Sequence, residues 1–185
     1  PVNRTMGIEI ECFYNGDFNR QRHSGFFYAT QDGSIDCNWN QTGVEWVSQP
    51  LTKGWLKKEI DKLWVKHSPW QWNNTCGIHI HVSRKWLSDK KARAIYKFLQ
   101  NQSNVFLREI FGRSSNYYCR TTGSYGSTRY CTINSENSAT IEFRMFRSGD
   151  ANWAKYCVDC VEYMIQNAHH LSTDGCYAFR DLYKL

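Results

Sequence analysis

Apolar and polar residues alternate along several short segments of this chain, as in MGIEIECF (residues 6–13) and GIHIHVS (residues 77–83). Successive side chains of a strand point to opposite faces of a sheet, so this alternation predicts strands with one buried face. The predicted strands cover residues 6–13, 26–30, 44–48, 77–83, 127–133 and 140–146.

Apolar residues at helical spacing mark the other elements. Leu56, Ile60 and Leu63 fall on one face of a predicted helix, and Ser88 is a typical N-cap for the next one. The predicted helices cover residues 55–67, residues 89 toward 111, and residues 151–171. Residues 112–126, rich in Ser, Gly and Tyr, read as a loop.

The order of these elements predicts an α+β fold, because some strands follow one another directly and helices separate the others. We expect a mostly antiparallel, curved sheet with helices packed on one face and an active site on the other. The chain has 185 residues, which suits one domain over residues 1–185 with a substantial core.

The face of the strands opposite the apolar residues carries an unusual set of side chains. Its predicted members are Glu9, Glu11, Glu45, His79, His81, Ser83, Arg129, Glu142 and Arg144. A sheet with one face in water is the simple interpretation. Lys is absent from these strand positions, however, so we favour one shared polar site over a solvated face.

Several glutamates on one surface repel one another, and a bound cation removes that repulsion. Carboxylate oxygens with one or two imidazoles suit Mg²⁺ or Mn²⁺. The His-x-His pair could also bind zinc, although zinc sites contain few carboxylates. We therefore expect a divalent-metal site.

Two arginines, Arg129 and Arg144, are expected beside this acidic cluster. The planar guanidinium suits phosphate or carboxylate groups. Metals held by carboxylates, together with an arginine that contacts phosphate, describe a phosphoryl-transfer site. The chain has neither a GxxxxGK[ST] loop nor a GxGxxG loop after a strand, so the sheet face and its metals would hold a nucleotide.

Composition narrows the class of protein further. The net charge of +6 suits anionic ligands, and eight Trp and eleven Tyr suit the stacking of nucleic-acid bases, so nucleic acid stays open as a partner. The chain has no apolar run near 18 residues and opens on no signal-peptide pattern, so we expect a cytoplasmic protein without membrane contact. The eight cysteines are expected to be reduced and structural, with a disulfide scaffold or a zinc site as the alternatives.

Five motifs in the same order resemble those of the amidoligase family, which is related to glutamine synthetase and glutamate–cysteine ligase. They are GIEIE (residues 7–11), DGS (residues 32–34), GVEWVSQPL (residues 43–51), CGIHIHVS (residues 76–83) and TIEFRMF (residues 140–146). The resemblance implies the curved catalytic sheet of glutamine synthetase. It also implies ATP- and Mg²⁺-dependent joining of a carboxylate to an amine through an acyl phosphate.

The resemblance also implies roles for individual residues. The implied ligands of Mg²⁺ or Mn²⁺ are Glu9, Glu11, Glu45, His79 and Glu142. The residues implied to contact ATP are Arg144, Arg129, His81 and Ser83. Arg144, Arg129 and Asp32 are the implied catalytic residues, and Ser34 would touch the substrate beside Asp32. The region after Phe146 is short for the family, so the nucleotide pocket would be minimal or would be completed by a second subunit of a homo-oligomer.

Two other functions fit the same residues. A metal-dependent phosphohydrolase or nuclease would use the acidic cluster to activate water. A non-catalytic metal- or nucleotide-binding module would use the cluster only to hold an ion.

Overall fold

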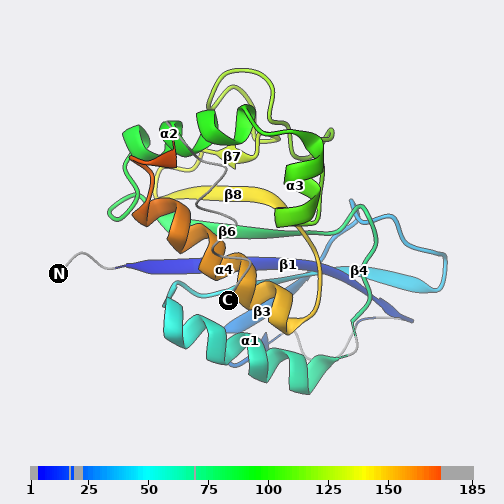
Figure 1. Cartoon of the computed structure of the whole chain (residues 1–185). Coiled ribbons are helices and arrows are strands. Elements are labelled where there is room, and N and C mark those ends of the chain that lie inside the picture. The colour runs from blue at the N-terminus through cyan, green and yellow to red at the C-terminus, as the bar shows by residue number, and fades with distance from the viewer. Residues whose placement is uncertain (1–3, 17, 19–22, 69, 172–185) are drawn as a thin grey trace.

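The computed structural model describes residues 4–16, 18, 23–68 and 70–171, which form one eight-stranded sheet and four helices (Figure 1). The strands are β1 (Thr5–Asn15), β2 (His23–Ser24), β3 (Phe27–Gln31), β4 (Gln41–Ser48), β5 (Leu51–Thr52), β6 (Gly77–Ser83), β7 (Ile133–Asn134) and β8 (Thr140–Arg147). The helices are α1 (Lys53–His67), α2 (Asp89–Gln100), α3 (Asn104–Phe111) and α4 (Ala151–Gln166). The predicted α+β class is confirmed.

The sheet has the strand order β2-β3-β4-β1-β6-β8-β7, and the short strand β5 pairs with the start of β1. Every pair of neighbouring strands is antiparallel, as the sequence predicts. The strand β1 lies between β4 and β6, so residues of these three strands share the middle of the sheet.

One face of the sheet is covered by helices. Figure 1 shows α4 lying across the sheet, with α1 along its lower part, and α4 contacts α1, α2 and β6. Ile8 and Ile10 of β1 are fully buried against this layer. All four helices contribute buried residues to the same hydrophobic core, which explains why their apolar residues recur at helical spacing.

The single helix predicted from residue 89 toward 111 is wrong, because the structure has two helices there. The first, α2, ends at Gln100, and the backbone N–H of Asn101 bonds to the carbonyls of Phe98 and Leu99. The second, α3, starts after Ser103, whose hydroxyl accepts the N–H of Phe106 at 3.1 Å. A helix N-cap is favourable for serine, so Ser103 begins a new helix where apolar spacing alone suggests a continuous one.

The strand predicted over residues 127–133 is also wrong for most of its length. Only Ile133 and Asn134 join the sheet, as β7. Residues before them form turns, in which the N–H of Ser127 bonds to the carbonyl of Ser124 and that of Cys131 to Thr128. Arg129 therefore lies on an exposed turn instead of a strand.

An irregularity in β8 changes which side chains face the core. Ile80 pairs with Phe143, but Ile78 pairs with Phe146, so β8 has one extra residue opposite His79. This β-bulge resets the alternation. Phe146 therefore faces the buried layer with Phe143, although strict alternation would place it on the polar face.

Two further predictions concern disulfides and membrane-spanning helices. Seven of the eight cysteines fall in the described part of the chain and none of these seven is in a disulfide, while Cys176 lies outside it. Within the described residues, no helix combines the length and apolar character that a membrane crossing requires.

Candidate active site

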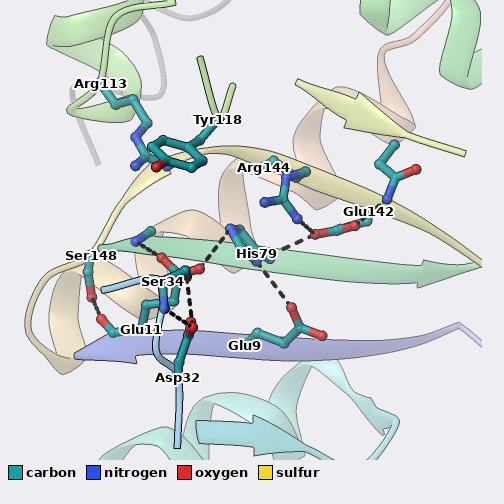
Figure 2. Close-up of polar contacts among 12 residues, drawn as sticks. Glu9, Glu11, Asp32, Ser34, His79, Arg113, Tyr118, Glu142, Arg144 and Ser148 are labelled. Atoms are coloured by element: carbon teal, nitrogen blue, oxygen red, sulfur yellow. Dashed lines mark hydrogen bonds and ion pairs between the residues drawn. The ribbon is translucent and has the colours of Figure 1, made fainter. Parts of the chain in front are cut away.

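The face of the sheet away from α4 holds a cavity of about 410 Å³ (Figure 2). Its acidic and imidazole lining residues are Glu9, Glu11, Asp32, Glu45, His79, His81 and Glu142. Its cationic lining residues are Arg113, Arg129 and Arg144. The sequence prediction of one shared polar face is therefore confirmed for its carboxylates, both histidines and Arg144.

Glu9 lies between the two histidines of β6. Glu9 pairs directly with His79 across the two strands, and its Oε2 lies 3.1 Å from His79 Nδ1. Its other oxygen lies 2.9 Å from His81 Nε2. Burial alone would raise the pKa of Glu9, but the hydrogen bonds and charges of the two imidazoles outweigh burial and lower that pKa well below its ordinary value.

Glu11 is held by the backbone of a neighbouring strand. Its Oε2 accepts the N–H of Gly77 at 2.5 Å, and its Oε1 lies 3.6 Å from His79 Nε2. A Cβ at position 77 would lie 2.7 Å from Arg113 Nη1 and 3.2 Å from His79 Nε2. A side chain at position 77 would therefore displace the Arg113 guanidinium and crowd His79 in the space where the carboxylate, imidazole and guanidinium meet.

Glu142 links the acidic part of the cavity to the arginines. It pairs directly with His81 across β6 and β8, and its Oε1 lies 3.4 Å from His79 Nδ1. Arg144 donates to the same oxygen, and Asn134 of β7 donates to Oε2 at 2.7 Å. The Nε of Arg144 is buried and has no hydrogen-bond partner among the described residues.

The connection between β3 and β4 brings Asp32 and Ser34 to the edge of the cavity (Figure 2). The Oδ1 of Asp32 accepts bonds from the N–H and the hydroxyl of Ser34, at 2.8 and 2.7 Å. A Cβ at Gly43 would lie 2.9 Å from the Cβ of Ile35, so only glycine lets this loop pack over the sheet. The DGS and GVEWVS motifs are thus joined in space.

Glu45 stands directly opposite Glu11 in the pairing of β4 with β1. No oppositely charged partner within ion-pair distance is found for it among the described side chains. Burial, together with the neighbouring charge of Glu9, raises the pKa of Glu45 to about 7. A carboxylate in this position is stabilised by a cation that replaces its proton.

Three overlapping groups of side chains place ligand atoms within 4.8 Å of one another. They are Glu9 with Glu45 and His79, Glu9 with His81 and Glu142, and Glu11 with Asp32 and Glu45. The donors are mostly carboxylate oxygens with one imidazole, which fits Mg²⁺ or Mn²⁺ better than zinc. Because Glu9 and Glu45 each belong to two groups, the cluster fits more than one ion.

Several cavity residues lack any periodic signal in the sequence. Arg113 follows α3, is almost fully buried, and donates to the carbonyl of Asn74 at 3.4 Å. Tyr118 and Tyr130 stand beside Arg129, whose guanidinium lies 5.0 Å from the centre of the Tyr130 ring. These residues reach the cavity through turns, so no pattern in the sequence predicts that they line it.

Two predicted site residues have a different position from the one expected. Arg129 reaches the cavity from a turn and bonds to the hydroxyl of Tyr130 at 2.9 Å, instead of projecting from a strand. Ser83 does not line this cavity; it lines a neighbouring cavity, which also includes Glu9 and His81. Its hydroxyl accepts the N–H of Lys85 at 3.2 Å.

No model of a known protein family matches this chain, and no curated protein matches it significantly.

Proposed function

We propose that this chain is an ATP- and Mg²⁺-dependent carboxylate–amine ligase with a catalytic sheet of the glutamine-synthetase type. The observation that supports the proposal most strongly is the convergence of the motifs that resemble amidoligases. Glu9, Glu11, Glu45, His79 and Glu142 meet on one face of an antiparallel sheet, with Arg144 beside them.

The site fits divalent metal and nucleotide phosphate together. Glu9, Glu45 and His79 would hold one ion, and Glu11 with Asp32 and Glu45 a second. The ions would supply positive charge to the phosphate oxygens during transfer. Arg144 would bind the transferred phosphoryl group, and Arg113 and Arg129 would bind the rest of the phosphate chain.

The proposed reaction has two steps, phosphoryl transfer to the acid and attack of the amine on the acyl phosphate. A carboxylate oxygen of the acid attacks the γ-phosphorus of ATP, the bond to the β-phosphate oxygen breaks, and ADP leaves. The amine nitrogen then attacks the carbonyl carbon of the acyl phosphate, the carbon–oxygen bond breaks, and inorganic phosphate leaves. The amine gives up a proton in this step, and a glutamate of the cavity or Asp32 would accept it.

The test uses the purified chain with ATP, Mg²⁺ or Mn²⁺, and panels of carboxylic acids and amines. We expect ADP to form only when an acid is present and an amide to form when an amine is added. Glu9→Gln should abolish both products, whereas Glu162→Gln removes the same charge from α4 on the covered face and should leave them unchanged. Absence of ADP with every metal and acid would contradict the proposal.

One observation favours a second candidate, a metal-dependent nuclease or phosphohydrolase. Tyr117, Tyr118 and Tyr130 pack against one another beside the cavity in edge-to-face or tilted pairs, with ring centroids 5.3 to 6.3 Å apart. Arg120 lies over the Tyr117 ring at 4.7 Å. Such a surface suits single-stranded nucleic acid. Metal-dependent cleavage of an oligonucleotide, without any acid or amine, would favour this candidate over the ligase.

A further inference from the structure

A second cavity of about 420 Å³ adjoins the first on the same face of the sheet. The two cavities share Glu9 and His81 as lining residues. The second cavity extends toward the start of β1, where Gly7 pairs with His81. A molecule in the second cavity would therefore reach the site at the Glu9 and His81 end.

The two cavities differ in chemistry. Apart from Glu9 and His81, the described residues that line the second cavity are uncharged, and no Lys or Arg is among them. Val47, Pro50 and Ala139 supply apolar surface, and Gly7 supplies no side chain at all. The second cavity thus suits an uncharged aliphatic group and gives no binding site for phosphate.

The walls of the second cavity are held in place before any ligand binds. On one side, Asn137 Oδ1 accepts the N–H groups of Ala139 and Thr140, and Arg84 donates to the carbonyl of Asn137 at 2.9 Å. On the other side, the hydroxyl of Ser48 accepts the N–H of Ile8 at 2.9 Å. A preformed cavity binds a ligand with little ordering of the protein.

We infer that this second cavity binds the aliphatic part of the amine substrate, whose amino group lies at the Glu9 and His81 end. The inference rests on the proposed function and names the class of its second substrate. The boundary holds the Glu9 carboxylate and the His81 imidazole, 2.9 Å apart, so it offers hydrogen-bond acceptors to an amino group. No Lys or Arg lines the second cavity to pair with a carboxylate substrate. The carboxylate substrate then belongs in the first cavity, beside Arg144.

The chain offers two substitutions that test the cavity. A Cβ at Gly7 would make only ordinary contacts, 3.7 Å from Ser48 Oγ and 3.8 Å from His81 Cβ, so this position accepts a side chain, and Gly7→Val adds two further methyl groups beside the cavity. Val47→Thr keeps the shape of the wall but makes it polar. Val65→Thr makes the same change at an exposed site on α1 and serves as the matched control.

The experiment measures binding of n-hexylamine, methylamine and hexanoate to the Mg²⁺-loaded chain by calorimetry and ligand-detected NMR. We expect hexylamine to bind at least about tenfold more tightly than methylamine, because its additional methylene groups are buried. Gly7→Val should reduce that preference to less than about threefold, Val47→Thr should reduce it partly, and Val65→Thr should leave it intact, all without a change in Mg²⁺ affinity.

The outcomes separate this inference from the ligase proposal. Equal binding of hexylamine and methylamine, or hexanoate binding that Gly7→Val weakens, would overturn the assignment of the second cavity to the amine. Selective hexylamine binding that Gly7→Val removes would support it, even if no ADP forms in the activity assay and the ligase proposal fails.

Discussion

The two faces of β1 use the same eleven-residue strand in opposite ways. Ile8 and Ile10 pack against the helices and are fully buried, whereas Glu9 and Glu11 face a cavity and are held by imidazoles and a backbone N–H. Packing on the first face stabilises the fold. The second face contains charges that do not fully compensate one another, so its residues are suited to binding a ligand. Substitutions on the first face should therefore lower stability, and substitutions on the second face should mainly weaken binding.

The largest contrast should come from adjacent residues of β4. Trp46 is fully buried, and Trp46→Ala should lower the free energy of unfolding by about 3–5 kcal/mol because it leaves a cavity in the core. Glu45→Gln should change that energy by less than about 1 kcal/mol, because burial already favours the neutral form of this side chain. Urea denaturation of both variants measures the difference, and equal destabilisation would mean that the polar face is also a stabilising core.

Divalent metal should stabilise the chain through the polar face alone. At one hundred times its dissociation constant, Mn²⁺ should raise the free energy of unfolding by about 2.7 kcal/mol, because it binds only the folded chain. The shift in the melting temperature with Mn²⁺, reversed by a chelator, measures this effect. Glu9→Gln should weaken the shift, because it removes a ligand of one ion, and Glu162→Gln should retain it; a shift that is unchanged in Glu9→Gln would place the ion outside the groups that contain Glu9.

A methyl group at Gly77 should disturb the polar face by a smaller amount. Gly77→Ala brings a Cβ to 2.7 Å from Arg113 Nη1, and we expect a loss of about 1–3 kcal/mol of stability together with weaker Mn²⁺ binding. Gly54→Ala is the control, because nothing lies within 4 Å of a Cβ there and the residue is on an exposed part of α1. Denaturation and metal titration of both variants test this prediction, which is wrong if Gly77→Ala has the same stability and Mn²⁺ affinity as Gly54→Ala.

The smallest expected effect is a pH dependence of the metal-free chain. Burial and the charge of Glu9 raise the pKa of Glu45 to about 7, so the folded chain holds this proton more tightly than the unfolded chain does. Burial would lower the pKa of His81, but its hydrogen bond with Glu9 raises that pKa overall. Both groups lose their protons as pH rises, so together they should lower stability between pH 5 and 8, by an amount on the order of 1 kcal/mol.

The depressed pKa of Glu9 has the opposite effect at lower pH, where its stabilising contribution is lost as the carboxylate is protonated. Denaturation at pH 5, 6.5 and 8 in the presence of a chelator measures the dependence, with Glu45→Gln expected to show a shallower decline than the wild type. Mn²⁺ displaces the same protons, so its stabilising effect should be larger at pH 8 than at pH 6. Stability of the wild type that rises relative to Glu45→Gln over this range would contradict the assignment.

Alternation predicted the composition of the polar face because a strand leaves each side chain only two directions. Glu9, Glu11 and Glu45 reach one cavity for that reason, and His79 and Glu142 complete it across β6 and β8. The order of the strands did not have to be known. When all strands belong to one sheet with one face covered by helices, their polar positions share the other face in any order.

Prediction failed where the position of a residue depends on turns. The strand expected around Arg129 is a series of turns, because hydrogen bonds such as Ser127 to Ser124 replace sheet pairing. Arg113 and Tyr118 follow α3 in a segment without periodicity, so their arrival at the cavity depends on tertiary packing. The break between α2 and α3 depends on the cap at Ser103, which competes with an apolar pattern that continues past it.

The extra residue in β8 has a consequence for how this strand can change length. Removing one residue near Met145 would let β8 continue in a single register with β6 and would leave Phe146 opposite Ile78, on the same face as Phe143. Such a deletion removes the surplus residue opposite His79, so the core would keep the Phe146 ring and the cavity would keep Glu142. A one-residue change in the length of β8 at the bulge therefore preserves both faces, whereas the same change among the regularly paired residues 140–143 would exchange them.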